Sequence, residues 1–374
     1  RVFVDTGTYT LPHATSVTIR DRNTGTVEMP LAILGSTNYA AGGSLLMGNG
    51  SANGIYLLNT RNIEMRDLRV AHCLNGVLMQ NVSGATLFGM ELYNNATNGL
   101  VVSGSSGVQF QNGRVWANRN YGYVCEGMGG DLIQNCTFWG NTQGAIWSRV
   151  GMQVSNSIMC ATNSMPLYVE NGPGAAISGD YNLYQLAPGA VVGTNTAKQV
   201  AYAYLSQWQA RGRDQHSFVD NPLFVNPAAG NFHLRSQAGY WSNGTWAVAT
   251  NTSWAIDAGD PVRAVSNEPP NNGGRINLGA YGGTAQASLS DTAHPGLLSL
   301  TLRDGGTSYN GMELHWLYRG LSPTNTVRIE FSRDNGATWL QAAPTADGLP
   351  IDSSPYIWYS TAEPSPMALW RVVL

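Results

Sequence analysis

The chain has 374 residues, 43% of them hydrophobic and 11% charged, with a formal net charge of −3 at pH 7. The hydrophobic content is too high for a disordered chain. The chain has no clusters of basic residues, so its charge gives no indication of a nucleic-acid-binding protein. No run of 18 apolar residues occurs, so the sequence contains no candidate membrane-spanning helix. Because Arg1 lies in a strand-like segment without a signal-peptide pattern, we expect a fragment or processed product.

A glycine that opens a short apolar strand recurs every 22 or 23 residues, at Gly54, Gly76, Gly99, Gly122 and Gly144. Such a period is typical of a solenoid, in which each unit buries its apolar face against the next. A second strand with alternating apolar residues follows within each period, and no helical stretch separates the two. The pattern predicts an all-β protein with a right-handed parallel β-helix, which we assign to residues 1–290.

Alignment on these glycines predicts columns of side chains along the solenoid axis. One predicted column comprises Leu57, Met79, Val102, Cys125 and Trp147. Asparagines recur at the corners in the same way, because this residue tolerates left-handed backbone and can bond to a stacked copy of itself. We expect structural ladders at two corners, formed by Asn95, Asn118 and Asn141 and by Asp67, Asn112, Asn135 and Asn156.

Two outward columns are candidates for function. Tyr93, Trp116 and Trp139 align on successive units, which are about 4.8 Å apart in a parallel sheet, and so predict an aromatic stripe. The stripe either seals a corner of the solenoid or offers a flat surface to the apolar face of a sugar. We name these three residues as the candidate ligand-binding set.

Arg69, Glu91 and Arg114 form the second column, with alternating charge on three successive units. Glu91 would lie between two guanidinium groups, which favours its ionised form and makes it a poor general acid. A charge ladder that stabilises the sheet is the simpler interpretation, and contact with an anionic sugar is the alternative.

Catalysis of polysaccharide cleavage needs either two facing carboxylates or a base beside a group that neutralises charge. The acidic residues of the repeats do not align on neighbouring units, so the sequence offers only weak catalytic candidates. These are Asp67, His72, Glu91 and Arg114.

The four cysteines, Cys73, Cys125, Cys136 and Cys160, all fall within the repeats and lack metal-binding spacing. No two of them share a column on neighbouring units. We expect small buried side chains, with a disulfide as the alternative.

The pattern changes after residue 180. The sequence predicts one short helix over residues 203–211 and further turns of the solenoid over residues 224–234. Three acidic residues lie in the glycine- and proline-rich segment that follows, and we name them as weak candidates for Ca²⁺ binding: Asp257, Asp260 and Glu268. The alternative is that they close turns at the end of the solenoid, so the sequence predicts either no cofactor or calcium.

This part of the chain resembles secreted right-handed parallel β-helix repeat proteins with choice-of-anchor motifs. The resemblance is carried by five segments in the same order: DYNLY, LSQWQ, DNPLFVNPAAGNFHL, AIDAGDP and GGRINLGAYGGT. The resemblance covers about residues 1–290. It implies the β-helix architecture and export to the cell surface or exterior, and it assigns no catalytic residue.

Residues 295–374 contain alternating strands separated by turn signals, with sandwich-like spacing. This segment resembles the Ig-like or fibronectin-type modules of exported proteins, which imply a β-sandwich that acts as a spacer.

These observations favour an extracellular or cell-surface protein with a binding, adhesive or structural role, and carbohydrate as its ligand. Expected partners are polysaccharides or other cell-surface components, and not nucleic acid. One alternative is a polysaccharide-active lyase, epimerase or glycoside hydrolase. Another is a filament subunit, because the open ends of a solenoid permit head-to-tail packing.

Overall fold

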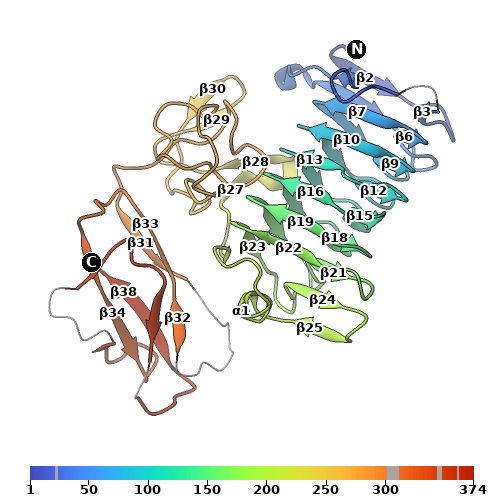
Figure 1. Ribbon diagram of the computed structural model, residues 1–374. Helices are drawn as coiled ribbons and strands as arrows, with labels where there is room; N and C mark the ends of the chain where they lie inside the picture. Colours follow the sequence, from blue (N-terminus) through green and yellow to red (C-terminus); the bar gives the residue numbers. More distant parts are fainter. Residues whose placement is uncertain (22–23, 301–310, 343–347, 360–361) are drawn as a thin grey trace. The chain divides into compact units, whose positions relative to one another are not determined.

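The computed structural model describes residues 1–21, 24–300, 311–342, 348–359 and 362–374, which form two compact units (Figure 1). Unit 1 comprises residues 1–203 and 207–289, and unit 2 comprises residues 204–206 and 290–374. Unit 1 contains a parallel β-solenoid whose first strands lie at one end of the stack and whose strands β24 and β25 lie at the other.

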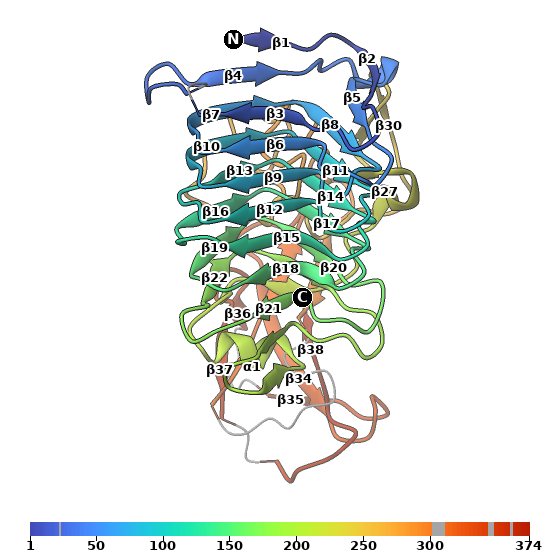
Figure 2. The same ribbon diagram turned by 90° about the vertical axis from the view of Figure 1, so that its right-hand side faces the viewer.

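Three sheets run the length of the solenoid, and the chain visits them in turn (Figure 2). Sheet 1 comprises β1 (Val2–Phe3), β4 (Leu31–Leu34), β7 (Arg61–Arg66), β10 (Ser83–Phe88), β13 (Gln109–Gln111), β16 (Asp131–Gln134), β19 (Met152–Ser155) and β22 (Ile177–Asp180). Sheet 2 comprises β2 (Gly7–Thr10), β5 (Ser44–Met47), β8 (Leu68–Ala71), β11 (Glu91–Tyr93), β14 (Arg114–Trp116), β17 (Thr137–Trp139), β20 (Ile158–Cys160), β23 (Leu183–Gln185) and β26 (Phe218–Val219). Sheet 3 comprises β3 (Val17–Arg20), β6 (Ile55–Leu58), β9 (Val77–Gln80), β12 (Leu100–Ser103), β15 (Tyr121–Glu126), β18 (Gly144–Ser148), β21 (Tyr168–Glu170), β24 (Gly193–Asn195) and β25 (Val200–Tyr202).

Strand pairing within the three sheets is parallel except between β24 and β25. The predicted column from Leu57 to Cys125 is confirmed, since these residues pair in register and are fully buried. The prediction that Trp147 is the last member of this column was wrong. Trp147 pairs with Val124, and Ser148 continues the column beside Cys125. The glycine alignment slipped here because Gly144 pairs with Tyr121 and not with Gly122, and a slip of one residue moves a side chain to the other face.

The corners follow the predicted asparagine pattern. Asn95 Nδ2 donates to Asn118 Oδ1, and Asn118 Nδ2 donates to Asn141 Oδ1, each at 2.9 Å. The other corner is left-handed at each aligned position, with φ between 49° and 56° at Asp67, Asn112, Asn135 and Asn156. The ladder at Asn95, Asn118 and Asn141 is therefore confirmed. At the other corner the left-handed backbone is present, but Asn112 Nδ2 and Asn135 Nδ2 donate to the backbone carbonyls of Gly282 and Asn277.

The segment after the solenoid differs from the prediction. Residues 224–234 do not continue the β-helix; they form an antiparallel hairpin of β27 (Phe224–Asn226) and β28 (Asn231–Leu234). Pro227 begins a 3-10 turn and Gly230 takes a left-handed φ of 74°, which reverses the chain. A second hairpin joins β29 (Tyr240–Ser242) to β30 (Thr245–Ala247). The last strand of the parallel sheets is thus β26, well before residue 290.

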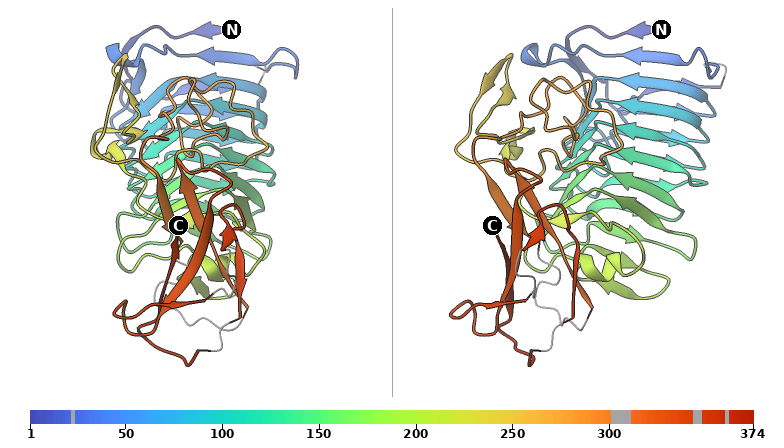
Figure 3. Two further views of the ribbon diagram at one scale, coloured as in Figure 1. Left: turned by 90° about the vertical axis from the view of Figure 1, so that its left-hand side faces the viewer. Right: turned by 60° about the vertical axis from the view of Figure 1, so that its left-hand side comes forward.

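This segment lies beside the solenoid (Figure 3) and contacts the outer side of sheet 2. Phe232 of β28 packs against Trp116, and the backbone N–H of Ala280 donates to Thr137 Oγ1 at 3.0 Å. The predicted short helix is present as α1 (Leu205–Gln209).

Unit 2 contains small antiparallel sheets. β31 (Gly296–Ser299) pairs with β33 (Trp316–Arg319), and β32 (Met312–Leu314) pairs with β37 (Tyr356–Trp358). β34 (Thr326–Ser332) pairs with β35 (Leu340–Gln341), β36 (Leu349–Pro350) and β38 (Leu369–Val373). The buried core comprises Leu314, Trp316, Val327, Ile329, Ile351 and Val372. The mostly-β class is confirmed. In the described parts of both units, no helix has the length and apolarity needed to cross a membrane.

Candidate ligand pocket

The predicted charge ladder is present on sheet 2. Arg69 of β8, Glu91 of β11 and Arg114 of β14 pair in register on successive turns. Arg69 Nε donates to Glu91 Oε2 at 2.6 Å, and Arg114 Nη2 lies 3.5 Å from the same oxygen. The period of the repeat thus brings two guanidinium groups to one carboxylate.

Glu91 is 3% exposed, so its charge is removed from water. Burial by itself would raise the pKa of this carboxyl, but Arg114 and Arg69 and the indole N–H of Trp116 lower it below its ordinary value. Trp116 Nε1 donates to Glu91 Oε1 at 3.0 Å. Both carboxylate oxygens are therefore engaged, and the expectation of an ionised Glu91 agrees with this environment.

Arg114 lies between two tyrosine rings. Its Cζ is 5.1 Å from the ring centre of Tyr39 and 5.6 Å from that of Tyr281, and its Nη1 donates to the Tyr281 hydroxyl at 3.0 Å. Tyr39 belongs to the short 3-10 helix η1 (Tyr39–Ala41), which lies in the loop between β4 and β5. The Tyr39 hydroxyl donates to Asp67 Oδ1 at 2.9 Å, and burial raises the pKa of both groups.

His233 of β28 stacks on Tyr281, with ring centres 3.6 Å apart. Burial and the positive charge of Arg114 lower the pKa of His233 to about 3, so its imidazole is neutral at pH 7. Asn231 Oδ1 accepts from the His233 backbone N–H and lies 2.9 Å from the ring nitrogen Nδ1. Nε2 lies 3.2 Å from Gln286 Oε1, so each ring nitrogen faces a side-chain amide oxygen.

These residues surround a pocket of about 370 Å³ in unit 1, which we call the ladder pocket. Its lining is dominated by amides, hydroxyls, guanidinium groups and aromatic rings, with few aliphatic side chains. The lining residues are Thr37, Asn38, Tyr39, Ala40, Arg69, Glu91, Arg114, Ala229, Gly230, Asn231, His233, Trp241, Ser242, Asn243, Gly244, Tyr281 and Gln286. The volume is at the lower end of the roughly 300–1,000 Å³ that small-molecule sites occupy.

The weak catalytic candidates divide into two groups. Glu91 and Arg114 line the ladder pocket, and Asp67 is joined to it through Tyr39. His72 is exposed and outside the lining; its ring meets the edge of Tyr93 at a centroid distance of 6.5 Å. The structure therefore brings three of the four candidates together and separates His72 from them.

The aromatic stripe is in register as predicted, with Tyr93 beside Trp116 and Trp116 beside Trp139. Tyr93 and Trp116 stack with ring centres 4.7 Å apart. Phe232 packs against both tryptophans, at 6.0 Å from Trp116 and 6.3 Å from Trp139, and Trp116 is only 8% exposed. The hairpin thus covers the middle of the stripe, so Trp116 offers no open face to a ligand.

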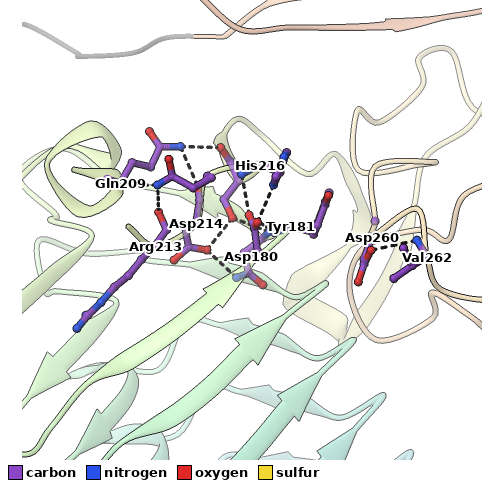
Figure 4. Close-up of polar contacts among 12 residues, drawn as sticks. Asp180, Tyr181, Gln209, Arg213, Asp214, His216, Asp260 and Val262 are labelled. Carbon is purple, nitrogen blue, oxygen red and sulfur yellow. Dashed lines mark hydrogen bonds and ion pairs between the residues drawn. The ribbon is translucent and has the colours of Figure 1, made fainter. Parts of the chain in front are cut away.

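The three calcium candidates make separate contacts. The backbone N–H of Asp257 donates to Asn277 Oδ1, whereas Glu268 Oε1 accepts from the backbone N–H groups of Asn277 and Gly283. Asp260 Oδ1 accepts from the backbone N–H of Val262 (Figure 4). Among the residues that the structure describes, no three His, Cys, Asp or Glu side chains are arranged to hold a metal ion. All three residues contact nearby turns through their carboxylates or their backbone N–H groups, which fits the interpretation that they close turns.

A second polar cluster closes the end of the solenoid (Figure 4). His216 Nδ1 lies 2.6 Å from Asp180 Oδ2, and the backbone N–H groups of Tyr181 and His216 donate to Asp180 Oδ1. Tyr181 stacks on His216 at 4.7 Å. The buried carboxylate of Asp214 accepts from Asn182, Ser217 and Trp208 at 2.6–2.8 Å. These bonds fix the turn at residues 214–217, which sequence reasoning did not single out.

The four cysteines are free and buried, as the simpler interpretation expects. Burial raises the pKa of Cys73 to about 11 and that of Cys125 and Cys136 to about 12, which suppresses the reactive thiolate. Burial also raises the pKa of Cys160.

Sequence reasoning missed the pocket residues outside sheet 2. Tyr39, His233, Trp241, Tyr281 and Gln286 lie in loops and hairpins that have no period. His233 and Tyr281 do occur in the segments GNFHL and LGAYGG, which carry the resemblance to exported β-helix proteins. That resemblance was the one signal that pointed to this part of the chain.

One comparison with known proteins bears on the solenoid. The family model described as "Right handed beta helix region" matches residues 48–181. A solved structure, the crystal structure of pectate lyase Pel9A, aligns with a TM-score of 0.40 and 13% sequence identity, covering 74% of this chain and 86% of that chain. No curated protein matches the sequence significantly.

Proposed function

We propose that unit 1 binds a carbohydrate in the ladder pocket and that the protein acts in a binding or adhesive role at the cell surface or outside the cell. The observation that carries this proposal is the lining of the pocket. Sugar hydroxyls both donate and accept hydrogen bonds, and Asn38, Asn231, Asn243 and Gln286 supply amides that do the same. The ring of Trp241 adds a surface for the apolar face of a sugar.

The rigidity of the pocket floor supports binding. Arg69 and Arg114 are held by Glu91, and Arg114 is further held between Tyr39 and Tyr281. Side chains that are already ordered lose little conformational entropy when a ligand arrives. The floor is therefore preorganised for a small polar ligand.

The titratable groups of the pocket favour binding over proton transfer. Glu91 is held ionised with both oxygens engaged, and His233 is neutral with its ring nitrogens beside Asn231 Oδ1 and Gln286 Oε1. A general base works best with a pKa near the working pH, and a His233 pKa of about 3 is far below it.

The low charge of the chain and the resemblance to exported β-helix proteins support an extracellular setting. The antiparallel strands and apolar core of unit 2 support an Ig-like module that serves as a spacer.

Calorimetric titration of the whole chain with a panel of neutral and acidic oligosaccharides tests the proposal. Ala40 lines the pocket and is exposed, so Ala40→Trp fills the pocket without disturbing the buried ladder. Ala201 is also exposed and belongs to β25, outside the lining, so Ala201→Trp is the matched control. We expect at least one oligosaccharide to bind, Ala40→Trp to abolish binding and Ala201→Trp to preserve it. Binding that survives Ala40→Trp, or none by any sugar, contradicts the proposal.

A second candidate is a polysaccharide-active enzyme of the lyase, epimerase or glycoside hydrolase class. The hydrogen bond between Tyr39 and Asp67 beside Arg114 favours it, because a carboxylate paired with a phenol next to a cation resembles a base with a charge neutraliser. Incubation with acidic and neutral polysaccharides, followed for unsaturated products and reducing ends, tests this candidate. It predicts cleavage that Asp67→Asn abolishes and Ala201→Trp preserves; no new product contradicts it.

A further inference from the structure

We infer that the ladder pocket selects an acidic sugar, with the carboxylate of a uronic acid bound by Arg114. This inference rests on the proposed carbohydrate-binding function and names the class of sugar. It follows from the balance of charge in the pocket, the burial of Arg114 and the shape of its guanidinium group.

The charges that line the pocket do not cancel. Arg69 and Arg114 face a single carboxylate, Glu91, in the lining. Glu91 is shared unequally, since its Oε2 lies 2.6 Å from Arg69 Nε and 3.5 Å from Arg114 Nη2. The lining thus holds two cations and one anion, and a ligand with one negative charge would restore the balance.

The surroundings of Arg114 strengthen this attraction. The residue is 9% exposed, so water screens its charge weakly. Its other neighbours are the rings of Tyr39 and Tyr281 and the neutral imidazole of His233, none of which carries a negative charge at pH 7. Asp67, the next acidic group, lies beyond Tyr39 and outside the lining. An anion in the pocket would thus meet the Arg114 guanidinium in a poorly hydrated setting.

The geometry favours a carboxylate. Guanidinium groups present N–H donors in a planar fork that matches the two oxygens of a carboxylate. Arg114 makes one hydrogen bond through Nη1, to the neutral hydroxyl of Tyr281, and its Nη2 faces Glu91 at 3.5 Å. Amides at Asn231 and Gln286 lie in the same lining and can receive ring hydroxyls. A uronic acid combines both requirements in one molecule.

Matched ligands test the inference without altering the protein. The probes are uronic-acid disaccharides of galacto, gluco and manno configuration, each compared with its methyl ester and with the neutral disaccharide of the same linkage. We expect at least one free acid to bind tenfold or more tightly than both uncharged counterparts, and 0.5 M NaCl to reduce this advantage. Sulfated disaccharides are titrated in the same way.

The outcomes separate the inference from the proposed function. If neutral sugars bind as well as the free acids, the preference for an acidic sugar is overturned while carbohydrate binding stands. If a sulfated sugar binds more tightly than every uronic acid, the assignment of a carboxylate is overturned. If no probe binds, both the inference and the proposed function fail.

One variant tests the role of Arg114 itself. Arg114→Lys keeps a positive charge but loses the planar fork. We expect the preference for free acid over methyl ester to fall at least fivefold, with folding checked by circular dichroism. An unchanged preference in a folded Arg114→Lys protein overturns the assignment, and the ester comparison on the unmodified protein remains decisive if this variant does not fold.

Discussion

Arg69 and Glu91 lie on neighbouring turns of the solenoid and are joined by a hydrogen bond of 2.6 Å between Nε and Oε2. The bond exists because the repeat places the two residues in register on adjacent strands of sheet 2. It anchors the floor of the ladder pocket, so the stability of the solenoid and the shape of the pocket depend on the same contact.

Replacing Glu91 by Gln should destabilise unit 1 strongly. Removing one partner of a buried ion pair leaves the other charge uncompensated, which typically costs about 3–5 kcal/mol. Here two guanidinium groups would lose their shared carboxylate. Urea denaturation followed by circular dichroism measures the loss. Glu126→Gln is the control because Glu126 is exposed in β15, and equal effects of the two substitutions would contradict this account.

Phe232→Ala should release the hairpin from sheet 2. Phe232 is 1% exposed and contacts Trp116, Trp139 and Phe224, and truncating a buried phenylalanine costs about 3–5 kcal/mol. We expect a lower unfolding temperature and a red shift of tryptophan fluorescence as Trp116 and Trp139 meet water. Phe3 is 75% exposed, so Phe3→Ala should change neither quantity. An unshifted spectrum in Phe232→Ala would show that the hairpin does not cover the stripe.

Glu268 should make stability depend on pH near neutrality. Burial raises its pKa from 4.5 to about 7, and its Oε2 is buried with no hydrogen-bond partner among the residues that the structure describes. The folded state therefore binds more protons than the unfolded state between pH 4.5 and 7, so stability falls as pH rises through this window. The shift corresponds to a loss of about 3 kcal/mol from this group.

Urea denaturation from pH 4.5 to pH 8 isolates this contribution by comparing the protein with Glu268→Gln. The variant has no carboxyl to ionise at this position, so its stability should fall less across the window. Parallel curves for the two proteins would rule out the raised pKa of Glu268.

The four cysteines should react with Ellman's reagent only after unfolding. Native thiols are buried and their raised pKa values leave little thiolate at pH 8. In denaturant without a reductant, four thiols per chain should react, since all four cysteines are free. A count of two would reveal a disulfide.

The sequence predicts the solenoid and the pocket floor well, because both depend on a period. Residues such as Arg69, Glu91 and Arg114 are placed by counting 22 or 23 positions along the chain. Counting in this way misplaces Trp147, because Gly144 pairs with Tyr121 and not with Gly122. Successive side chains of a strand point to opposite faces, so an error of one residue puts a side chain on the wrong face.

The walls of the pocket were not predictable in this way. Tyr39, His233 and Tyr281 come from an inserted loop, a hairpin and an irregular segment, and tertiary packing alone brings them to Arg114. Residues 224–234 have strand-like composition whether they form a hairpin or another turn of the solenoid. The direction of the chain at Pro227 and Gly230 decides between the two.

A crystal structure of the protein with the disaccharide that binds most tightly would show where the sugar lies. We expect a sugar ring in the ladder pocket, with oxygen atoms within hydrogen-bonding distance of Arg114 and of the amides of Asn231 or Gln286. A disaccharide bound elsewhere, for example against Tyr181 and His216, with the ladder pocket empty, would contradict this expectation.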